Sequence, residues 1–401
     1  MNISNHPIWT QITPYKSRIS VLKKPFHLLR IYFAKQYSKL FSRSLFIGVT
    51  GSVGKTTCTQ AIKSVLSEKF KILLTVPNLD PILNIPSTIL KIKPGVKKVV
   101  LEMGIEYKGE MGFYLEMVRP ETVVITRIYF AHSEFLGNIN EIIEEKGKLI
   151  EQLPAKGKAI LNWDDLNCRK LAEKTKAEVV FFGKDQKNCS IWADKIRIEN
   201  FKTKFELNYG VERVEVNFEL LGEHQIYPAL AAAAVGITEG LSLVQIKKGL
   251  EKLKPPEHRL QAVDGFNGSV ILDDTYNNAS PVGAEAAIDT LMSIPARRRI
   301  LVFGEMRELG KYSDELHRQV ARKIYNEKLD LVFLGTGDTK IIDEELKSLG
   351  FWEEKFESNL QNPQIVSKLL KVLTKGDVCL IKGSRGLRMD EIVKRVEKKS
   401  K

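Results

Sequence analysis

Short runs of apolar residues recur between residues 45 and 185, and the segments between them carry apolar residues at helical spacing. The runs read LFIGV, KILLTV, KVVLEM, TVVIT, KAILN and EVVFF. Apolar runs of this length are typical of strands buried on both faces, and strands that alternate with helices form parallel sheets. We therefore predict a doubly wound parallel sheet in this part of the chain.

The pattern changes at residues 191–221, where apolar and polar residues alternate around Gly210. Such alternation predicts an antiparallel meander, which we expect to form a small sheet appended to the parallel one. Two helical patterns follow, and the two prolines of KPPEHR interrupt them near residue 257. We place a domain boundary there, so that residues 46–257 form a central domain.

Beyond this boundary the runs SVILDD, RILVFG, DLVFLG and DVCLIKG again read as buried strands with helices between them. They predict a second, smaller α/β domain over residues 258–401, of the Rossmann-like kind. In such domains ligands bind beyond the carboxyl ends of the strands. The fold class is therefore α/β, with two parallel sheets and one antiparallel addition.

Residues 1–45 differ from both domains in charge. Residues 1–46 hold eight Lys and Arg and no Asp or Glu, in a chain whose net charge is +13. Over residues 20–43 we predict a basic amphipathic helix, whose apolar stripe either packs onto the next domain or lies on an anionic membrane surface. We expect no nucleic-acid partner, because no aromatic and basic pattern continues into the domains. The stripe consists of Phe26, Leu29, Phe33, Tyr37 and Leu40.

The composition, with 43% hydrophobic and 28% charged residues among 401, is that of a soluble globular protein of two or three domains. Its four cysteines show no metal-finger spacing, which suits a reducing compartment. No apolar run approaches the length of a membrane span, and no signal peptide is recognisable. We expect a cytoplasmic, monomeric protein.

The stretch FIGVTGSVGKTTCTQAI runs from a predicted strand through a glycine-rich turn into a helix. Gly51 and Gly54 permit tight turns whose N–H groups face phosphate oxygens, and Lys55 adds a full positive charge beside a helix N-terminus. Thr56 is placed to ligate Mg²⁺. The strict P-loop pattern fails, because Val49 stands where it requires glycine. The remaining variant predicts a nucleotide-phosphate site formed by Thr50, Gly51, Ser52, Val53, Gly54, Lys55, Thr56 and Thr57.

This loop resembles the ATP loop of the Mur ligases, the amino-acid-adding enzymes of peptidoglycan synthesis. Further motifs follow in the family's order: LEMG, AHSEFLG, EKGKLI, LNWDD, GEHQIYPALAAAA, HRLQ, DDTYNNASP, VFGEMRELG and IKGSRGLRM. The last motifs most resemble the ligase that adds D-alanyl-D-alanine to UDP-N-acetylmuramoyl-tripeptide. The resemblance implies an ATP-dependent amide ligase that uses magnesium and forms an acyl-phosphate intermediate.

The resemblance also assigns roles to individual residues. It implies that Lys55 is catalytic, and that Thr56, Glu102, His132 and a carbamylated Lys146 ligate the metal, the last three being catalytic as well. It implies that Arg259, Asp274 and Tyr276 contact ATP, and that Lys382, Ser384 and Arg385 grip the amine substrate. The residues themselves support Glu102, which ends a predicted strand. Without the resemblance, His132 would be read as a structural or surface residue, and Lys146 as part of a solvated helix face.

Several positions depart from the family's pattern. About 45 residues precede the ATP loop, which is too short for the family's N-terminal UDP-binding domain. Arg127 replaces a small or amide residue, and we expect it to bind an anionic or membrane-linked acceptor together with the basic segment. Two alternatives therefore stay open: a related ligase for a different carboxylate acceptor or amine, and a non-catalytic ATP-binding partner protein.

Overall fold

The six apolar runs between residues 45 and 185 are neighbouring strands of one sheet in the protein, a computed structural model that describes residues 6–9, 23–77, 79–351 and 353–398. The strand order is β2-β3-β1-β4-β5-β6-β7-β8-β9, and β2 through β7 are parallel. The predicted doubly wound sheet is thus confirmed. Its strands are β1 (Phe46–Thr50), β2 (Ile72–Leu74), β3 (Lys98–Glu102), β4 (Thr122–Ile125), β5 (Lys158–Asn162), β6 (Glu178–Gly183), β7 (Ile191–Glu199), β8 (Lys202–Tyr209) and β9 (Glu212–Phe218).

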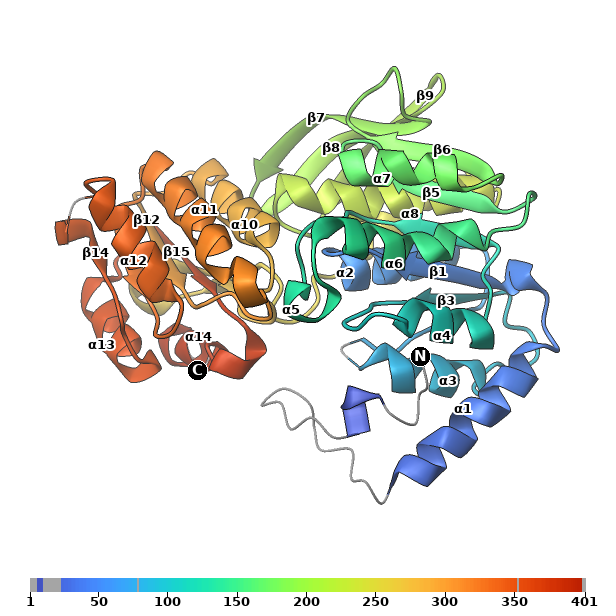
Figure 1. Ribbon diagram of the computed structural model, residues 1–401. Coiled ribbons are helices and arrows are strands. Elements are labelled where there is room, and N and C mark those ends of the chain that lie inside the picture. The colour runs from blue at the N-terminus through green and yellow to red at the C-terminus, as the bar shows by residue number, and fades with distance from the viewer. Residues whose placement is uncertain (1–5, 10–22, 78, 352, 399–401) are drawn as a thin grey trace.

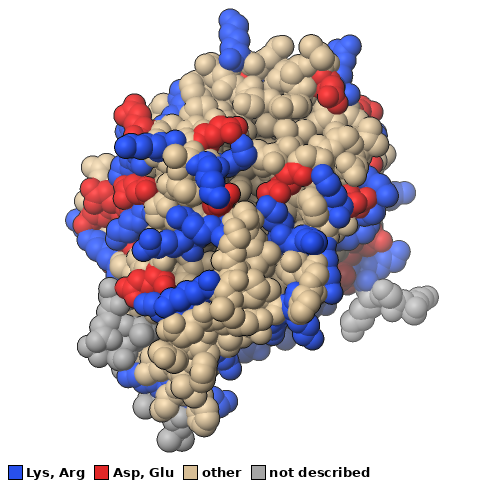
Figure 2. All heavy atoms as spheres, turned by 90° about the vertical axis from the view of Figure 1, so that its right-hand side faces the viewer, with Lys and Arg blue, Asp and Glu red and all other residues tan. Residues whose placement is uncertain are grey.

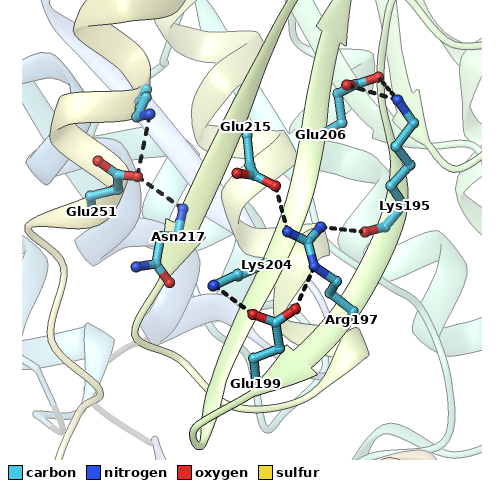
Figure 3. Close-up of polar contacts among 9 residues, drawn as sticks. Lys195, Arg197, Glu199, Lys204, Glu206, Glu215, Asn217 and Glu251 are labelled. Carbon is cyan, nitrogen blue, oxygen red and sulfur yellow. Dashed lines mark hydrogen bonds and ion pairs between the residues drawn. The ribbon is translucent and has the colours of Figure 1, made fainter.

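The antiparallel meander over β7, β8 and β9 is confirmed, but it continues the parallel sheet instead of forming a sheet of its own. The reason is that β7 begins beside β6 and pairs with it in parallel. Ion pairs tie the outer strands together (Figure 3): Arg197 contacts Glu199 at 2.7 Å and Glu215 at 2.5 Å. These side chains are exposed to solvent, so the pairs add little to the stability of the fold.

Helices cover both faces of this sheet because neighbouring strand residues point to opposite faces. Val99 belongs to one core and Val100 to the other. The first core is closed by α1 (Lys24–Ser38), α3 (Pro81–Ile89), α4 (Glu110–Met117), α6 (Ile139–Glu151) and α7 (Leu166–Leu171). The second is closed by α2 (Lys55–Leu66), α8 (Ile226–Thr238) and α9 (Leu243–Glu251), while the short α5 (Ser133–Leu136) lies beside the second domain (Figure 1).

The second sheet has the order β10-β11-β15-β12-β13-β14, with β10 antiparallel and the other strands parallel. The four runs predicted as strands are β11, β12, β13 and β15, and the boundary expected near residue 257 falls between α9 and β10. The strands are β10 (Gln261–Asp264), β11 (Val270–Asp274), β12 (Arg298–Phe303), β13 (Leu331–Leu334), β14 (Phe356–Glu357) and β15 (Asp377–Lys382). Its helices are α10 (Pro281–Ser293), α11 (Ser313–Asn326) and α12 (Thr339–Ser348) on one face, and α13 (Asn362–Val372) and α14 (Asp390–Val396) on the other.

The predicted N-terminal helix is present as α1, and it packs on α3 and α4. Of the two alternatives left open for the stripe, packing onto the next domain applies to only one of its five residues. Phe26, Leu29, Phe33 and Leu40 are exposed, and Tyr37 alone of the five is packed against the core. The inward face is formed by Ile31, Ala34 and Ser38 instead. Residues 20–22 of the predicted helix lie outside the described residues.

The two central strands β12 and β15 of the second sheet begin at a buried ion pair. Asp377 is fully buried, and both of its oxygens accept hydrogen bonds from Arg298, at 3.0 and 2.6 Å. Burial alone would raise the pKa of this carboxyl, but the hydrogen bonds from Arg298 and Thr374 outweigh burial and hold the pKa below its usual value.

We expect Arg298→Met to lower the free energy of unfolding at pH 7 by about 2 kcal/mol, since it leaves a buried carboxylate without its cation. Because the pKa of Asp377 is depressed in the folded protein, this stabilisation is present above the carboxyl's unfolded pKa and is lost as the pH falls through the folded value. Urea unfolding of both proteins between pH 7 and pH 3 measures the difference, which should shrink on acidification. Arg297→Met, at the exposed neighbour, should change little.

Candidate active site

The glycine-rich turn joins β1 to α2 and exposes backbone N–H groups at the carboxyl edge of the sheet. Gly51 has φ +147° and Gly54 has φ +77°, conformations that side chains other than glycine rarely adopt. A Cβ at Gly51 would lie 2.1 Å from Thr126 Oγ1, so the loop after β4 leaves no room for one. Lys55 follows as the first residue of α2, and its ammonium donates to the carbonyl of Gly51 at 3.0 Å.

The segment after β4 holds this turn in place. Ser52 donates its backbone N–H to the carbonyl of Arg127 at 2.7 Å and its hydroxyl to the carbonyl of Tyr129 at 2.6 Å. Thr126 donates its hydroxyl to the carbonyl of Val53 at 2.6 Å. The phosphate loop is therefore fixed in shape by contacts of the protein itself.

Glu102 lies beside the loop at the end of β3. Its carboxylate accepts a hydrogen bond from the hydroxyl of Thr56 at 3.1 Å, and Arg259 of the second domain approaches the same hydroxyl at 3.4 Å. The guanidinium of Arg259 stacks 4.4 Å from the ring centre of Tyr276, and its Nε is buried without a hydrogen-bond partner among the described residues. An anion placed between Lys55 and Arg259 would supply that partner.

The second domain contributes the opposite wall. Lys382 ends β15, is almost fully buried, and donates to Asp274 at 2.6 Å and to the carbonyl of Asn277 at 3.2 Å. Ser384 follows and is also buried, with its hydroxyl bonded to the carbonyl of Asn278. Arg385 is exposed, and its backbone N–H donates to the carbonyl of Tyr276.

A cavity of about 370 Å³ lies between these walls. It brings together thirteen of the residues predicted from the sequence: Ser52, Val53, Gly54, Lys55, Thr56, Thr57, Glu102, Arg127, His132, Arg259, Asp274, Tyr276 and Lys382. Five others do not line it: Thr50, Gly51, Lys146, Ser384 and Arg385. Thr50 is fully buried, where its hydroxyl donates to the carbonyl of Met103, and Gly51 supports the turn from behind.

His132 connects the two domains. Its Nδ1 lies 2.5 Å from the Glu308 carboxylate, and the neighbouring backbone N–H of Glu134 donates to the carbonyl of Glu308. His132 and Glu308 both have left-handed backbone conformations, with φ of +54° and +63°. Such conformations are uncommon outside glycine and cluster at functional sites. The contact with Glu308 holds the orientation of the imidazole ring through its Nδ1.

Lys146 lies in α6, 1% exposed, instead of on a solvated helix face. Burial, followed by the positive charge of Lys55, lowers the pKa of its ammonium well below the usual value, while Glu110 and Glu145 act in the opposite direction. Burial likewise lowers the pKa of Lys55, which Glu102 partly offsets. Lys146 is therefore far more readily deprotonated than an exposed lysine.

The N-terminal residues reach the back of this site. His6 is buried, its Nδ1 accepts from the backbone N–H of Ile8, and its Nε2 lies 2.8 Å from Glu110. The other oxygen of Glu110 accepts from the backbone N–H groups of Glu106 and Tyr107. The segment before the phosphate loop thus helps to fix the carboxylate that faces Lys146.

Sequence reasoning missed four residues here: His6, Glu110, His224 and Glu308. His224 lines the cavity, and burial lowers its pKa to about 4, so its imidazole is neutral at pH 7. Glu308 stands within the motif VFGEMRELG, but no role was assigned to it. His6 carries no sequence signal that could have revealed its contact.

The side chains around the cavity provide only part of a binding site for magnesium. Thr56 and Glu102 offer adjacent hard oxygen donors at the phosphate loop. Among the described residues, no group of three or more His, Cys, Asp or Glu side chains is arranged to hold a metal ion. A complete shell would therefore need oxygens from phosphate, water or a modified lysine. The residues present fit a cation that is bound together with a nucleotide.

A glycine-rich loop that faces a second α/β domain across a cavity lined by Lys55, Arg259 and Lys382 is typical of one class: two-domain enzymes that act on a nucleotide polyphosphate. Comparison with known proteins makes this class specific. Residues 49–236 match the model of the Mur ligase middle domain, and residues 258–385 match that of the Mur ligase, glutamate ligase domain. The UDP-N-acetylmuramoyl-tripeptide–D-alanyl-D-alanine ligase of Escherichia coli (strain K12) is 30% identical over 356 residues, 88% of this chain and 76% of that one.

Solved structures of Mur ligases resemble this chain along most of its length. MurF from Acinetobacter baumannii superposes with a TM-score of 0.83 at 25% identity, over 92% of this chain and 80% of that chain. MurF ligase from Thermotoga maritima in complex with ADP superposes with a TM-score of 0.81 at 25% identity, over 96% and 86%. The chain belongs to the Mur ligase family and is an ATP-dependent ligase.

We expect Glu308→Ala to loosen the contact between the domains, because the pair with His132 is one of the few side-chain links across it. The free energy of unfolding should fall by about 1–2 kcal/mol, and small-angle scattering should show a larger radius of gyration. Glu308→Gln, which keeps an acceptor for Nδ1, should stay near the wild type. Equal dimensions for all three proteins would show that the pair does not hold the domains together.

Proposed function

We propose that this protein adds D-alanyl-D-alanine to UDP-N-acetylmuramoyl-tripeptide in peptidoglycan synthesis, in the cytoplasm. The observation that carries the proposal is the cavity in which the phosphate loop, Glu102, Arg259 and Lys382 converge from two domains. The relatives whose names state this reaction are similar over most of the chain. The motifs DDTYNNASP, VFGEMRELG and IKGSRGLRM support the same substrates.

The reaction needs two steps, since a carboxylate is a poor electrophile. In the first step the acceptor carboxylate attacks the γ-phosphorus of ATP, which forms an acyl phosphate and releases ADP. In the second step the amine attacks the acyl carbon, inorganic phosphate leaves, and the nitrogen loses a proton. Negative charge accumulates on the transferring phosphoryl group, and fixed positive charges stabilise it.

Lys55 and Arg259 are the groups that meet this charge, from the loop and from the second domain. The loop N–H groups add oriented dipoles. Asp274 and the ring of Tyr276 would support the nucleotide side, with Asp274 held in place by its ion pair with Lys382. Contact between the domains excludes water, which would otherwise hydrolyse the acyl phosphate. Arg127 borders the same cavity and would face the anionic acceptor, while Ser384 and Arg385 would join Lys382 around the amine substrate's carboxylate.

Thr56, Glu102 and His132 would hold Mg²⁺, which supplies electrostatic stabilisation of the phosphate oxygens. Lys146 would complete this set as a carbamate. Its neutral amine adds to carbon dioxide, a carbon–nitrogen bond forms and one proton is released. Burial and Lys55 favour the neutral amine that this addition requires. The negative carbamate then relieves the crowding of positive charge that these two lysines create.

Replacing Lys55 by methionine should lower phosphate release by about 10³-fold, because a full charge next to the transferred group is lost. Phosphate release is measured with ATP and with UDP-N-acetylmuramoyl-tripeptide and D-alanyl-D-alanine, together and singly. Lys63→Met, on the exposed side of the same helix, is the matched control and should remain active.

The same assay separates the alternatives. Release that requires both substrates supports the proposal. Release with another carboxylate acceptor or amine would assign a different substrate to the same chemistry. ATP binding without release under any of these conditions would identify a non-catalytic ATP-binding protein.

Lys146→Ala should be inactive, and short-chain carboxylic acids should partly restore it by placing a carboxylate where the carbamate stood. A ¹³C carbamate signal should appear in the wild-type protein supplied with labelled carbon dioxide, and should weaken as the pH falls and the amine takes up a proton. Lys156→Ala, at an exposed position, should keep both activity and signal. Two results together would show that Lys146 is not a metal ligand: carboxylic acids do not restore the inactive variant, and the wild type gives no carbamate signal.

A further inference from the structure

The outward face of α1, together with the turn that follows it, carries large apolar side chains that are more than half exposed. We call Phe26, Leu29, Tyr32, Phe33 and Leu40 the outer stripe; their exposed fractions are 72%, 53%, 56%, 52% and 74%. At 100° per residue, the four positions within α1 fall in an arc of roughly 120°, and Leu40 lies two residues beyond the end of the helix. Of fifteen exposed large hydrophobic residues in the described part of the chain, five are in this stripe. Such concentration marks an interaction surface.

The opposite face of α1 is already used. Ile31 and Ala34 belong to the first core, Tyr37 donates its hydroxyl to the carbonyl of Ile92, and Ser38 donates to the carbonyl of Met117. The helix is therefore anchored on α3 and α4, and the outer stripe cannot turn inward without breaking these contacts. It is a fixed feature of the folded surface.

Positive charge borders the stripe, and one of these cations, Lys35, pairs with the exposed Glu116 of α4. Among described residues 23–46 there are six Lys and Arg and no Asp or Glu. Along the helix, Arg30 follows one edge of the stripe and Lys39 the other. Figure 2 looks onto the side of the molecule on which α1 lies, and shows a band of uncharged atoms bordered mostly by Lys and Arg.

A groove extends this surface at the end of α1. It lies between the helix end and the loop before β3, and it is lined by Leu40, Phe41, Lys93 and Lys97, among others. Residues 89–98 include four lysines and no acidic residue, and Lys91, Lys93 and Lys97 are exposed. The groove therefore combines an apolar wall with cations that lie within reach of an anion.

We propose that the outer stripe and this lysine loop bind the surface of an anionic lipid bilayer, with α1 lying in the plane of the interface. Apolar side chains beside lysines, and no acids, are the chemistry of interfacial helices. A second copy of the chain fits poorly, because two such faces would bring like charges together. A nucleic acid would pair with the lysines but leave Leu29 and Leu40 in water. Within the described ranges no helix is long and apolar enough to cross a membrane, so contact would be peripheral.

The test is co-sedimentation of the full chain with vesicles of phosphatidylcholine, with and without about 30% phosphatidylglycerol. We expect binding only to the anionic vesicles, and weaker binding at 0.5 M than at 0.1 M salt. Leu29→Glu combined with Phe33→Glu should reduce binding at least about tenfold, because two apolar contacts are lost and two charges repelled. Lys93→Glu combined with Lys97→Glu should reduce it as well.

The matched control is Leu166→Glu combined with Val211→Glu, which adds the same charge at apolar residues exposed elsewhere, 65% and 100%. Thermal unfolding should be unchanged in all variants, since every position is exposed. Equal binding to neutral vesicles, or an equal loss in the control, would overturn the proposal. Absence of vesicle binding would overturn it as well. Dimers that are seen by sedimentation velocity and that dissociate in the Leu29→Glu, Phe33→Glu variant would then identify a second copy of the chain as the partner. None of these readouts depends on ligase activity.

Discussion

Close pairing of buried charges around the cavity is the interaction on which the rest of the site depends. Lys55 is half-buried, with its ammonium bonded to the carbonyl of Gly51 and under the charge of Glu102, and Lys382 is buried in an ion pair with Asp274. A buried ion without a partner costs several kcal/mol, so these pairs fix where each cation can stand. These contacts within the protein hold the cations of the cavity in position. Little reorganisation remains to be done in the reaction, which is the condition for effective electrostatic catalysis.

The same constraint explains why the site is divided between two domains. Arg259 comes from the second domain and reaches Thr56 at 3.4 Å, while Glu308 reaches His132 at 2.5 Å. Both the contact of Arg259 with Thr56 and that of Glu308 with His132 would be lost if the domains separated. Contact between the domains and assembly of the charged site are thus one event, and the uncommon backbone conformations of His132 and Glu308 stand where that contact is made.

The sequence predicted the strands and the phosphate loop because their signals are local: an apolar run or a glycine spacing is complete within a few residues. Contacts between distant segments had no such signal. His6 meets Glu110 across 104 residues, and His132 meets Glu308 across 176. The helix α1 was itself predicted, but which of its faces meets the core was left open for a different reason. It carries apolar residues on two faces, Ile31 and Ala34 on one and Phe26 and Leu29 on the other, and periodicity alone does not tell which face meets the core.

The segment before the phosphate loop joins these two parts of the molecule. His6, the first described residue, contacts Glu110 at the back of the site. The helix α1 lies at the end of the molecule away from the C-terminal domain (Figure 1). The inner face of α1 anchors the helix on the core, while the outer stripe leaves hydrophobic surface in water. A surface that covered the stripe would lie beyond α3 and α4, and would leave the contact between the domains unobstructed. Because the two faces of α1 point in opposite directions, contact on the outer face would leave the packing of the inner face on α3 and α4 undisturbed.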